Sequence, residues 1–327
     1  MKRSAFCATV AWMLAAPACL AHESLPASLT LTQVQAQDYD VDWRLPALEG
    51  RAPAITPRFP DGCKADSAPI ERSAPGARVL HWRLRCVHDL ALGVRIEFDG
   101  LQASVVNVLA QLVMADGRHW SALASGRSPS LELGKAEGQL DVGGYFALGV
   151  SHILSGVDHL LFVLCLVLLV PGRMALLRTV SAFTLAHSAT LALAALGVLH
   201  VPQAPVEASI ALSIVFLARE LARPAGATLA RRWPALLAFG FGLLHGLGFA
   251  GALAEVGLPA GDIPLALLLF NLGVEAGQLA FVLVVSVLLL GWRRSTSLRL
   301  ERLCAYGVGG VAAFWTLQRL VPILGLA

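Results

Sequence analysis

The sequence contains few charged residues. Asp, Glu, Lys and Arg make up only 14% of its 327 residues, whereas 56% are hydrophobic. Soluble domains carry about 25% charged residues, so this composition excludes an ordinary soluble protein and indicates a membrane protein. Lysine does not occur after Lys135, and beyond it arginine supplies every strong cation. The formal net charge of +3 points to no particular partner, and we expect no nucleic acid to bind.

Motifs of hydrolytic and phosphate chemistry are also missing. The sequence contains no HExxH pattern, and nothing in residues 22–140 resembles a catalytic triad or a phosphate-binding loop. We therefore expect no enzyme and no tightly bound cofactor.

Cysteines are few. Cys63 and Cys86 are expected to form a disulfide in an exported region, with metal binding by the pair as an alternative. Cys165 and Cys304 lie in apolar stretches and are expected to pack as small hydrophobic residues.

The chain begins with the pattern of a secretory signal peptide. Lys2 and Arg3 precede an apolar run, and the alanine-rich segment that follows ends at Ala21. We expect residues 1–21 to be cleaved, although Cys19 leaves a lipoprotein site as an alternative. The new N-terminus would be His22, whose amine and imidazole together could chelate a divalent ion; an ordinary polar residue is the simpler interpretation.

Residues 22–140 are expected to form a separate exported domain. Short segments in this region alternate apolar and polar residues and are rich in Val, Ile and aromatic residues. Clusters of Pro and Gly separate them, which is typical of strands joined by turns. The pattern predicts a β-sandwich-like domain outside the membrane.

Residues 141–327 are expected to form a membrane domain of six transmembrane helices. The candidate spans are 143–170, 176–199, 205–222, 234–254, 263–291 and 303–323. Every second joint carries arginines, whereas the joints 199–207 and 254–264 contain neither Lys nor Arg. Positive charge marks the cytoplasmic side of membrane proteins. We therefore expect the exported domain and the C-terminus on the periplasmic side of a bacterial inner membrane.

The first span contains three ionisable residues, His152, Asp158 and His159. A charge inside a membrane helix costs about 3 kcal/mol or more, so such residues are candidate functional groups. The two histidines lie on one stripe, but seven residues of intact helix would separate them by about 10 Å. They can share an ion only if the helix breaks at Ser155–Gly156. Otherwise they belong to successive sites.

Two further spans carry a histidine each. His187 shares a face with Thr184 in the second span, and His245 lies beside a seam formed by Gly242 and Gly246 in the fourth. Such groups can also serve only to join helices. Imidazole suits Ni, Co, Zn and Cu(II), whereas the absence of paired Cys or Met argues against Cu(I).

The remaining spans add carboxylates and amides. Asn271, Glu275 and Gln278 follow i, i+4, i+7 on one stripe of the fifth span, which packing alone does not explain. Glu207 opens the third span, where a carboxylate in the first helical turn is favoured anyway. Arg319, near the end of the sixth span, is expected to belong to the scaffold.

These motifs resemble those of the HupE/UreJ family of hydrogenase and urease accessory membrane proteins, in the branch with an exported N-terminal domain. The resemblance rests on His152 followed by Asp158–His159, FTLAHS around His187, LLHGLGFA around His245 and NLGVE around Glu275. The first motif is similar to a one-residue-longer form of the His-x4-Asp-His signature of nickel/cobalt permeases.

The resemblance implies a secondary transporter of nickel or cobalt. It implies that His152, Asp158 and His159 bind the ion, and that His187, His245 and Glu275 lie along its path. Asn271, Gln278, Thr184 and Glu207 are expected beside this path. Ile153 is a departure, because shorter family members have proline there, and the identity of the metal stays open. The expected partners are a divalent metal ion, the lipid bilayer and proteins of metalloenzyme maturation.

Two alternatives stay open. The first is a non-transporting accessory or metal-sensing protein, in which the exported domain binds a partner. The second is an intramembrane metallohydrolase with a histidine-ligated ion and Glu275 as base. Three side chains that converge at bond distance would favour the hydrolase, whereas a file of polar groups across the membrane would favour transport.

Overall fold

The fold is described from a computed structural model. It describes residues 26–47, 52–74, 77–104, 106–133, 142–199, 201–223, 228–256, 263–290 and 297–325. The expected signal peptide and His22 lie outside these residues. The described chain divides into two compact units, which we call the β unit (Ser24–Leu148 with Glu255–Leu269) and the helical unit (Gly149–Ala254 with Phe270–Ala327).

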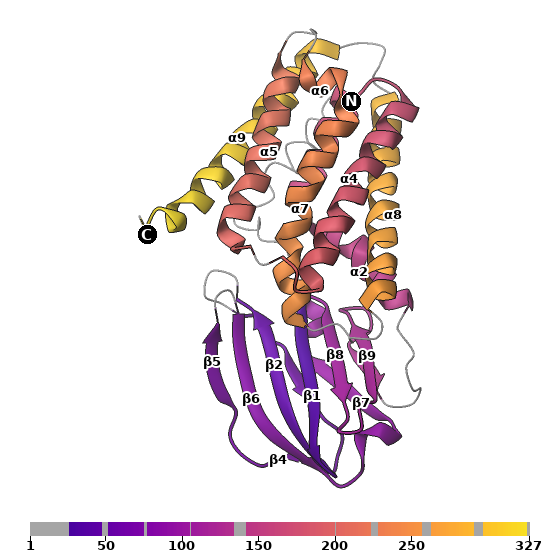
Figure 1. The fold of residues 1–327 in the computed structure, drawn as a ribbon, viewed down its shortest axis with the longest axis vertical. Coiled ribbons are helices and arrows are strands. Elements are labelled where there is room, and N and C mark those ends of the chain that lie inside the picture. The colour runs from indigo at the N-terminus through magenta and orange to yellow at the C-terminus, as the bar shows by residue number, and fades with distance from the viewer. Residues whose placement is uncertain are drawn as a thin grey trace. The chain divides into compact units, whose positions relative to one another are not determined.

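The β unit contains ten strands among its described residues. They are β1 (Ala27–Gln35), β2 (Asp38–Pro46), β3 (Thr56–Arg58), β4 (Cys63–Ala65), β5 (Ile70–Ala74), β6 (Ala77–Cys86), β7 (Val94–Asp99), β8 (Val108–Val113), β9 (His119–Ala124) and β10 (Ser130–Leu133). One sheet has the order β4-β6-β2-β1-β8-β9 with β5 paired to β6 (Figure 1). A smaller sheet has the order β10-β7-β3. The pairings are antiparallel except for β1 and β8, which run parallel.

The two sheets share one apolar core. Strands β2 and β7 both alternate, so that Val41 and Trp43 from the larger sheet and Ile96 and Phe98 from the smaller sheet are buried in the same cluster. The rings of Trp43 and Phe98 stack at 5.7 Å between centroids. Alternation with a period of two places every second side chain on the same face of a strand. The expected β-rich N-terminal domain is confirmed.

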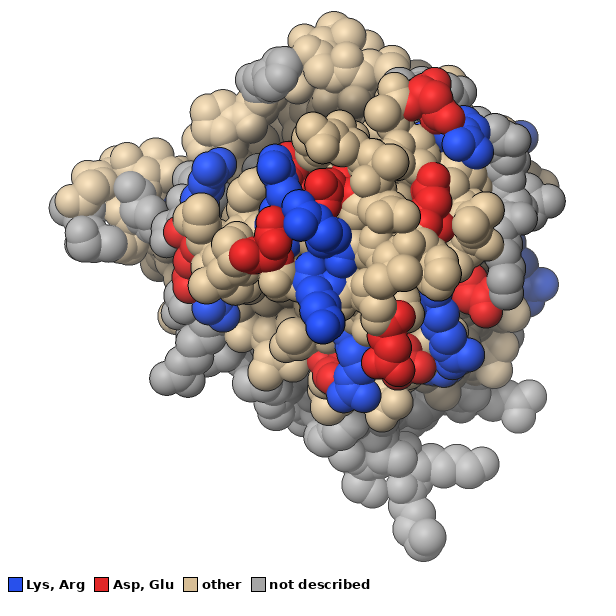
Figure 2. All heavy atoms as spheres, turned by 90° about the horizontal axis from the view of Figure 1, so that it is seen from below, with Lys and Arg blue, Asp and Glu red and all other residues tan. Residues whose placement is uncertain are grey.

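The outward side chains of β2 and β6 form a row of polar pairs, in which two acids pair with arginines and one with a histidine. Their partners face each other across the strand pair, as Asp38 with Arg85 at 2.7 Å, Asp40 with Arg83 at 3.1 Å and Asp42 with His81 at 2.9 Å. The hydrogen bond from Arg85 lowers the pKa of Asp38. Figure 2 shows acidic and basic side chains interleaved on one face of the molecule. Charge pairs of opposite sign across adjacent strands support the sheet register.

The expected disulfide between Cys63 and Cys86 is present. The two cysteines lie directly opposite each other in the pairing of β4 with β6. They are 23 residues apart in the sequence. Closing a loop of this length is worth roughly 3 kcal/mol of unfolding free energy. The bond therefore holds the short edge strand β4, which has few ladder hydrogen bonds of its own, against the sheet.

The α-helices of the described residues are α2 (Val142–Ser155), α3 (Val157–Leu169), α4 (Arg173–Ala195), α5 (Gln203–Ala222), the short α6 (Leu229–Arg232), α7 (Pro234–Val256), α8 (Ile263–Leu290) and α9 (Ser297–Ile323). The first turns of α2 and α8 belong to the β unit, and the rest of both helices belongs to the helical unit.

Two of the described helices are long and apolar enough to cross a membrane by themselves, namely Arg173–Ala195 and Ile263–Leu289. Helices α2 and α3 form a third candidate span if the bent pair counts as one. The helical region thus contains two or three apolar spans by length and composition, whereas the sequence predicts six. The first expected span, 143–170, is interrupted by a bend of 72° between α2 and α3.

The helical unit is packed around α3. Helices α5 and α9 lie along each other, and α3 lies against both. Phe162, Cys165, Ile214 and Ala312 from these three helices are at most 1% exposed and belong to one apolar cluster. The expected burial of Cys165, and likewise of Cys304, is confirmed.

Glycines bring α7 close to α4. A Cβ atom added at Gly242 would collide with the carbonyl of Phe183, and one at Gly246 would collide with the carbonyl of His187. The seam predicted from these small residues therefore exists, and it places His245 of α7 opposite α4.

Candidate metal centre

A break in the first apolar stretch places two histidines in one cluster. Gly156 stands between α2 and α3 with an extended backbone, φ −74° and ψ 94°. The Ser155 hydroxyl donates back to the Ser151 carbonyl at 2.7 Å and helps to close the last turn of α2. Because the chain bends here, the ring centroids of His152 and His159 lie 5.1 Å apart. Of the two interpretations of this segment, the structure shows the broken helix.

Gly156 itself fits closely against both histidines. A Cβ atom at this position would lie 2.9 Å from His159 Nδ1 and 3.0 Å from the His152 carbonyl oxygen. Real Cβ atoms do not tolerate the first of these distances without a shift of the ring. A glycine at the bend is therefore part of what allows the two imidazoles to approach each other.

Two further helices complete a cluster of four imidazoles. The His187 ring, from α4, lies 6.0 Å from that of His152 and 5.9 Å from that of His159. The His245 ring, from α7, lies 5.0 Å from that of His159. The four side chains are between 0% and 7% exposed. Two histidines bound tetrahedrally to one ion have ring centres roughly 5 Å apart, given bonds of about 2.1 Å. The cluster has nearly that spacing.

The ring nitrogens of the four histidines do not converge on one point. No three His, Cys, Asp or Glu side chains in the described part of the chain are arranged to hold a metal ion as they stand. The imidazoles instead pack against one another and against Phe162, Phe183 and Phe270. Ion binding would require the rings to turn within the cluster. The metallohydrolase, which needs a converged ligand set, gains no support from this geometry.

Ser213 of α5 orients one of these imidazoles. Its hydroxyl donates to the Ile210 carbonyl at 2.6 Å, and its oxygen lies 3.0 Å from His245 Nε2. A hydroxyl has one proton to donate and a carbonyl can only accept, so His245 Nε2 must carry the proton of the shared bond. The lone pair of His245 is then on Nδ1, which is buried without a hydrogen-bond partner among the described residues. Such outer partners commonly fix the tautomer of a metal-binding histidine.

The ring nitrogens of His187 are even less satisfied by hydrogen bonds than those of His245. It is fully buried, and neither Nδ1 nor Nε2 has a hydrogen-bond partner in the described part of the chain. A buried polar atom without a partner costs about 1–3 kcal/mol. Native structures contain few such groups, and each calls for an explanation. Coordination of a metal ion by His187 would supply one.

Asp158 lies between the cluster and an arginine. Its Oδ1 is 3.5 Å from His159 Nδ1, and its Oδ2 is 3.4 Å from Arg319 Nη2. Arg319 also donates from Nη1 to the Glu207 carbonyl at 2.9 Å, and its Nε lies 3.8 Å from the Glu207 carboxylate. Asp158 and Arg319 are 3% and 7% exposed. Arg319, expected to belong to the scaffold, thus pairs with a candidate metal ligand.

Two residues of the site, Ser213 and Arg319, were not predicted from the sequence. Ser213 shares a stripe of its span with Ser209, but hydroxyls are common on apolar helix faces and this stripe indicated no function. Arg319 did carry a signal, because it follows the uncharged stretch 303–318 at the end of the span away from the arginine-bearing joints. An arginine in that position is an exception to the charge bias and suggests a buried acidic partner.

The polar stripe of α8 faces α4. Ser181 donates to Glu275 at 2.7 Å, and Thr184 donates to the amide oxygen of Gln278 at 2.8 Å. Gln278 is 1% exposed, whereas Glu275 and Asn271 are half-buried. Glu275 is thus held by a hydroxyl of α4 rather than by one of the four histidines. Thr184, Glu275 and Gln278 lie at one helix–helix contact, and Glu207 lies beside Arg319.

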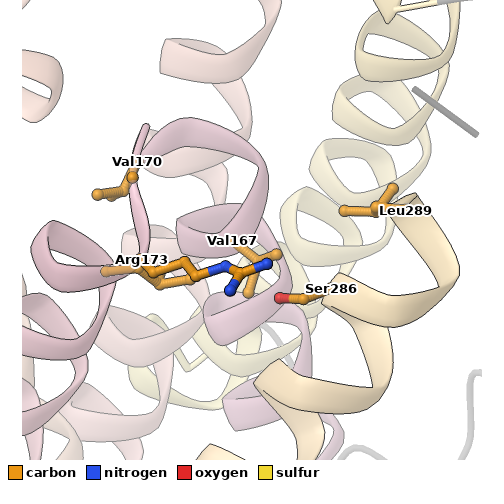
Figure 3. A pocket seen from close by; sticks show the side chains of 7 residues that line it. Val167, Val170, Arg173, Ser286 and Leu289 are labelled. Carbon is orange, nitrogen blue, oxygen red and sulfur yellow. The ribbon is translucent and has the colours of Figure 1, made fainter. Parts of the chain in front are cut away.

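A separate cavity of about 180 Å³ lies at the other end of α3 (Figure 3). It is lined by Val167, Val170, Gly172, Arg173, Leu176, Ser286 and Leu289. None of the candidate ligands borders it. The Arg173 side chain extends across it toward Ser286 (Figure 3). This cavity is therefore distinct from the histidine cluster.

Buried imidazoles beside a carboxylate, held by apolar helices, are typical of membrane-associated proteins that handle transition-metal ions. The chain belongs to the HupE/UreJ family. The family model described as HupE / UreJ protein matches residues 130–319, which is more than half of the chain. The family identified from the motifs is thereby confirmed. Comparison with curated proteins and with solved structures finds no match.

Family membership gives the chain a general role. HupE/UreJ proteins are membrane-associated, and the family implies an accessory or transport role in the handling of nickel for hydrogenase and urease. They are not known as enzymes. The matched residues include all four histidines, Asp158, Glu275 and Arg319. Most of the matched range lies in the helical unit, where the histidine cluster is found.

Proposed function

We propose that the chain is a secondary transporter that moves a divalent transition-metal ion across a bacterial inner membrane. The expected ion is Ni²⁺, with Co²⁺ as the alternative. The proposal is carried by the cluster of His152, His159, His187 and His245, in which four helices bring four imidazoles to ring distances of 5.0–6.0 Å. Imidazole is a preferred ligand of both ions.

In this proposal the membrane domain crosses the bilayer six times. The bent pair α2–α3 is one crossing, and α4, α5, α7, α8 and α9 are the others. The arginine-bearing joints face the cytoplasm, so the exported β-rich domain and the C-terminus face the periplasm. Discontinuous helices are found at the ion sites of many transporters, and the break at Gly156 would have the same role.

The proposed mechanism is ligand exchange. A hydrated ion loses part of its water shell to His152, Asp158 and His159, and the Asp158 carboxylate offsets part of its charge. His245, with its lone pair on Nδ1, and His187 complete the ligand set as their rings turn toward the ion. Each exchange replaces one polar partner by another, so no step leaves the ion bare in a low-dielectric interior.

Glu275 is the proposed next carboxylate on the path. Ser181 holds it at the contact between α4 and α8, where Thr184 and Gln278 form a second polar pair. With Asn271 on the same stripe, these groups would offer oxygen ligands to an ion that leaves the imidazoles. Glu207 is proposed at the other end of the path, beside Arg319.

The test is ion uptake by the full-length protein in reconstituted vesicles, with Ni²⁺, Co²⁺ and Zn²⁺ compared. Replacement of His187 by alanine should reduce uptake of the preferred ion by roughly 10- to 100-fold or more, because losing even an outer partner of a ligand costs that much. His81→Ala, in the β unit, is the matched control and should leave uptake unchanged. Equal uptake of the preferred ion by the wild type, His187→Ala and His81→Ala would disprove the proposal.

The second candidate is a metal-sensing accessory protein of metalloenzyme maturation. It is favoured by the nearly complete burial of the cluster, since all four histidines are at most 7% exposed. A sensor would bind Ni²⁺ at the same imidazoles without moving it. Stoichiometric binding in the absence of vesicle uptake would select this candidate over the transporter.

A further inference from the structure

We propose that Arg319 is a tethered cation that competes with the metal ion for Asp158. The inference rests on the proposed function and assigns a positioning role to a residue outside the histidine cluster. While the cluster holds no ion, the guanidinium neutralises the Asp158 carboxylate. When a divalent ion binds, the guanidinium moves to Glu207.

The two oxygens of Asp158 face different neighbours. Oδ1 faces the cluster, at 3.5 Å from His159 Nδ1, and Oδ2 faces Arg319 Nη2 at 3.4 Å. An ion held by the imidazoles would approach Oδ1 while the guanidinium stays on Oδ2. Two cations would then share one buried carboxylate. In a low-dielectric interior such repulsion is little screened, so the presence of Arg319 weakens ion binding.

Glu207 offers the guanidinium a second partner. Arg319 is anchored to it by the hydrogen bond from Nη1 to the Glu207 carbonyl at 2.9 Å. The Glu207 carboxylate lies 3.8 Å from Nε, which is too long for a good hydrogen bond. A small rotation would tighten this contact and lengthen the one to Asp158. The Trp315 ring, with its centroid 6.0 Å from the guanidinium carbon, lies near the cation.

This arrangement has a consequence for transport. A carboxylate that waited unpaired in the interior would be costly, and one that met only the ion would hold it too tightly to let it leave. A tethered cation removes both difficulties, because it stabilises the empty site and helps to displace the ion. Loss of the guanidinium should therefore tighten binding and slow release, which a purely structural role of Arg319 does not predict.

The experiment is calorimetric titration of the full-length protein in lipid nanodiscs with NiCl₂. Arg319→Gln should bind Ni²⁺ more tightly than the wild type, on the order of tenfold, which is a usual size for coupling between two sites. Arg319→Lys keeps the charge and should stay near the wild-type affinity. Arg178→Gln removes an exposed arginine from the same unit and should change nothing. In vesicles, Arg319→Gln should lower both KM and the maximal rate.

Unchanged or weaker Ni²⁺ binding by a folded Arg319→Gln protein would overturn the inference. If that variant does not fold, Glu207→Gln provides the second test, because the guanidinium then has no acid to receive it. Ni²⁺ binding should weaken several-fold, and unchanged affinity would overturn the inference. Failure of the wild type to bind Ni²⁺ would instead remove the proposed function, and this inference with it.

Discussion

The two units of this protein place the same kind of ion pair in opposite surroundings. In the β unit, Arg85 and Asp38 are joined at 2.7 Å with side chains 59% and 17% exposed. In the helical unit, Arg319 and Asp158 are 3.4 Å apart with side chains 7% and 4% exposed. Water screens the first pair, so its net contribution to stability is small. The second pair is hardly screened, so breaking it is expensive.

The comparison shows that ion pairs have different roles in the two units. The charges on β2 and β6 line the outer face of a sheet whose core is apolar, and they favour one strand register. In the helical unit, Asp158 and Arg319 lie inside. Their burial is a cost that packing alone does not repay, which is why a functional role is expected for them.

The largest predicted effect comes from removing one acid of each pair. Asp158→Asn leaves the buried Arg319 charge with only the Glu207 carboxylate, 3.8 Å away, and should cost up to about 3–5 kcal/mol of unfolding free energy. Asp38→Asn should cost far less, because water screens the surface pair. Thermal or denaturant unfolding of both full-length variants in detergent measures the difference. Equal destabilisation would show that the helical-unit pair is as well hydrated as the surface pair, and would contradict its burial.

A smaller effect is expected from the disulfide of the β unit. Cys63→Ser combined with Cys86→Ser should cost roughly 3 kcal/mol, because the loop closed by the bond becomes free in the unfolded chain. The helical unit has no such link between its described cysteines, since Cys165 and Cys304 form no disulfide. Hydrogen exchange should therefore speed up in peptides from β4 and β6. Acceleration in peptides from α3 and α9 instead would contradict this prediction.

The next effect concerns the bend between α2 and α3. Gly156→Ala should cost about 2 kcal/mol through the clash with His159 Nδ1, in the range typical of overpacking. It should also reduce ion binding, because the His159 ring must move away from His152. Gly240→Ala is the matched control, since nothing lies within 4 Å of a Cβ atom there. Binding of Ni²⁺ that is equal in the two variants would show that the bend does not position the imidazoles.

The strands of the β unit could be predicted well from the sequence, because the alternation that marks a strand is visible within a few consecutive residues. Alternation along β2 and β7 shows which side chains point inward, and the expected disulfide followed from exported cysteines. The parallel pairing of β1 with β8 could not be predicted, because it joins segments far apart in the chain. Local alternation contains no information about which strand becomes the neighbour.

The candidate site could be predicted only in part. The sequence left two possibilities for His152 and His159, a break at Ser155–Gly156 or two successive sites, because histidines seven residues apart on an intact helix cannot meet. It did not show that α4 and α7 would bring His187 and His245 to the same place, because helix neighbours are set by packing across the whole unit. The roles of Ser213 and Arg319 depend on partners on other helices. The position of Arg319 suggests a buried acid, but nothing within α5 or α9 indicates which residue the partner is.

Tyr39 carries a buried hydroxyl that contrasts with the buried imidazoles of the helical unit. Tyr39 is fully buried in the β unit, donates to Asp89 at 3.0 Å and accepts from the Leu90 amide at 3.0 Å. Burial raises the pKa of Tyr39 from its usual 10.0 to about 12. The folded β unit therefore binds the phenol proton more tightly than the unfolded chain does.

The sign of the pH effect follows from this raised pKa. The contribution of Tyr39 to stability is complete below about pH 10 and is lost as the pH rises toward 12, with roughly 1 kcal/mol lost by pH 11. Tyr39→Phe should be less stable at pH 8, because Asp89 and the Leu90 amide lose a partner, but it should lose less stability between pH 8 and 11. Denaturant unfolding of the full-length wild type and of Tyr39→Phe, monitored by hydrogen exchange in β2 peptides, measures how the stability of each protein changes with pH. Parallel slopes would show that the phenol is hydrated in the folded protein and that, unlike the His187 nitrogens, it is not shielded from solvent.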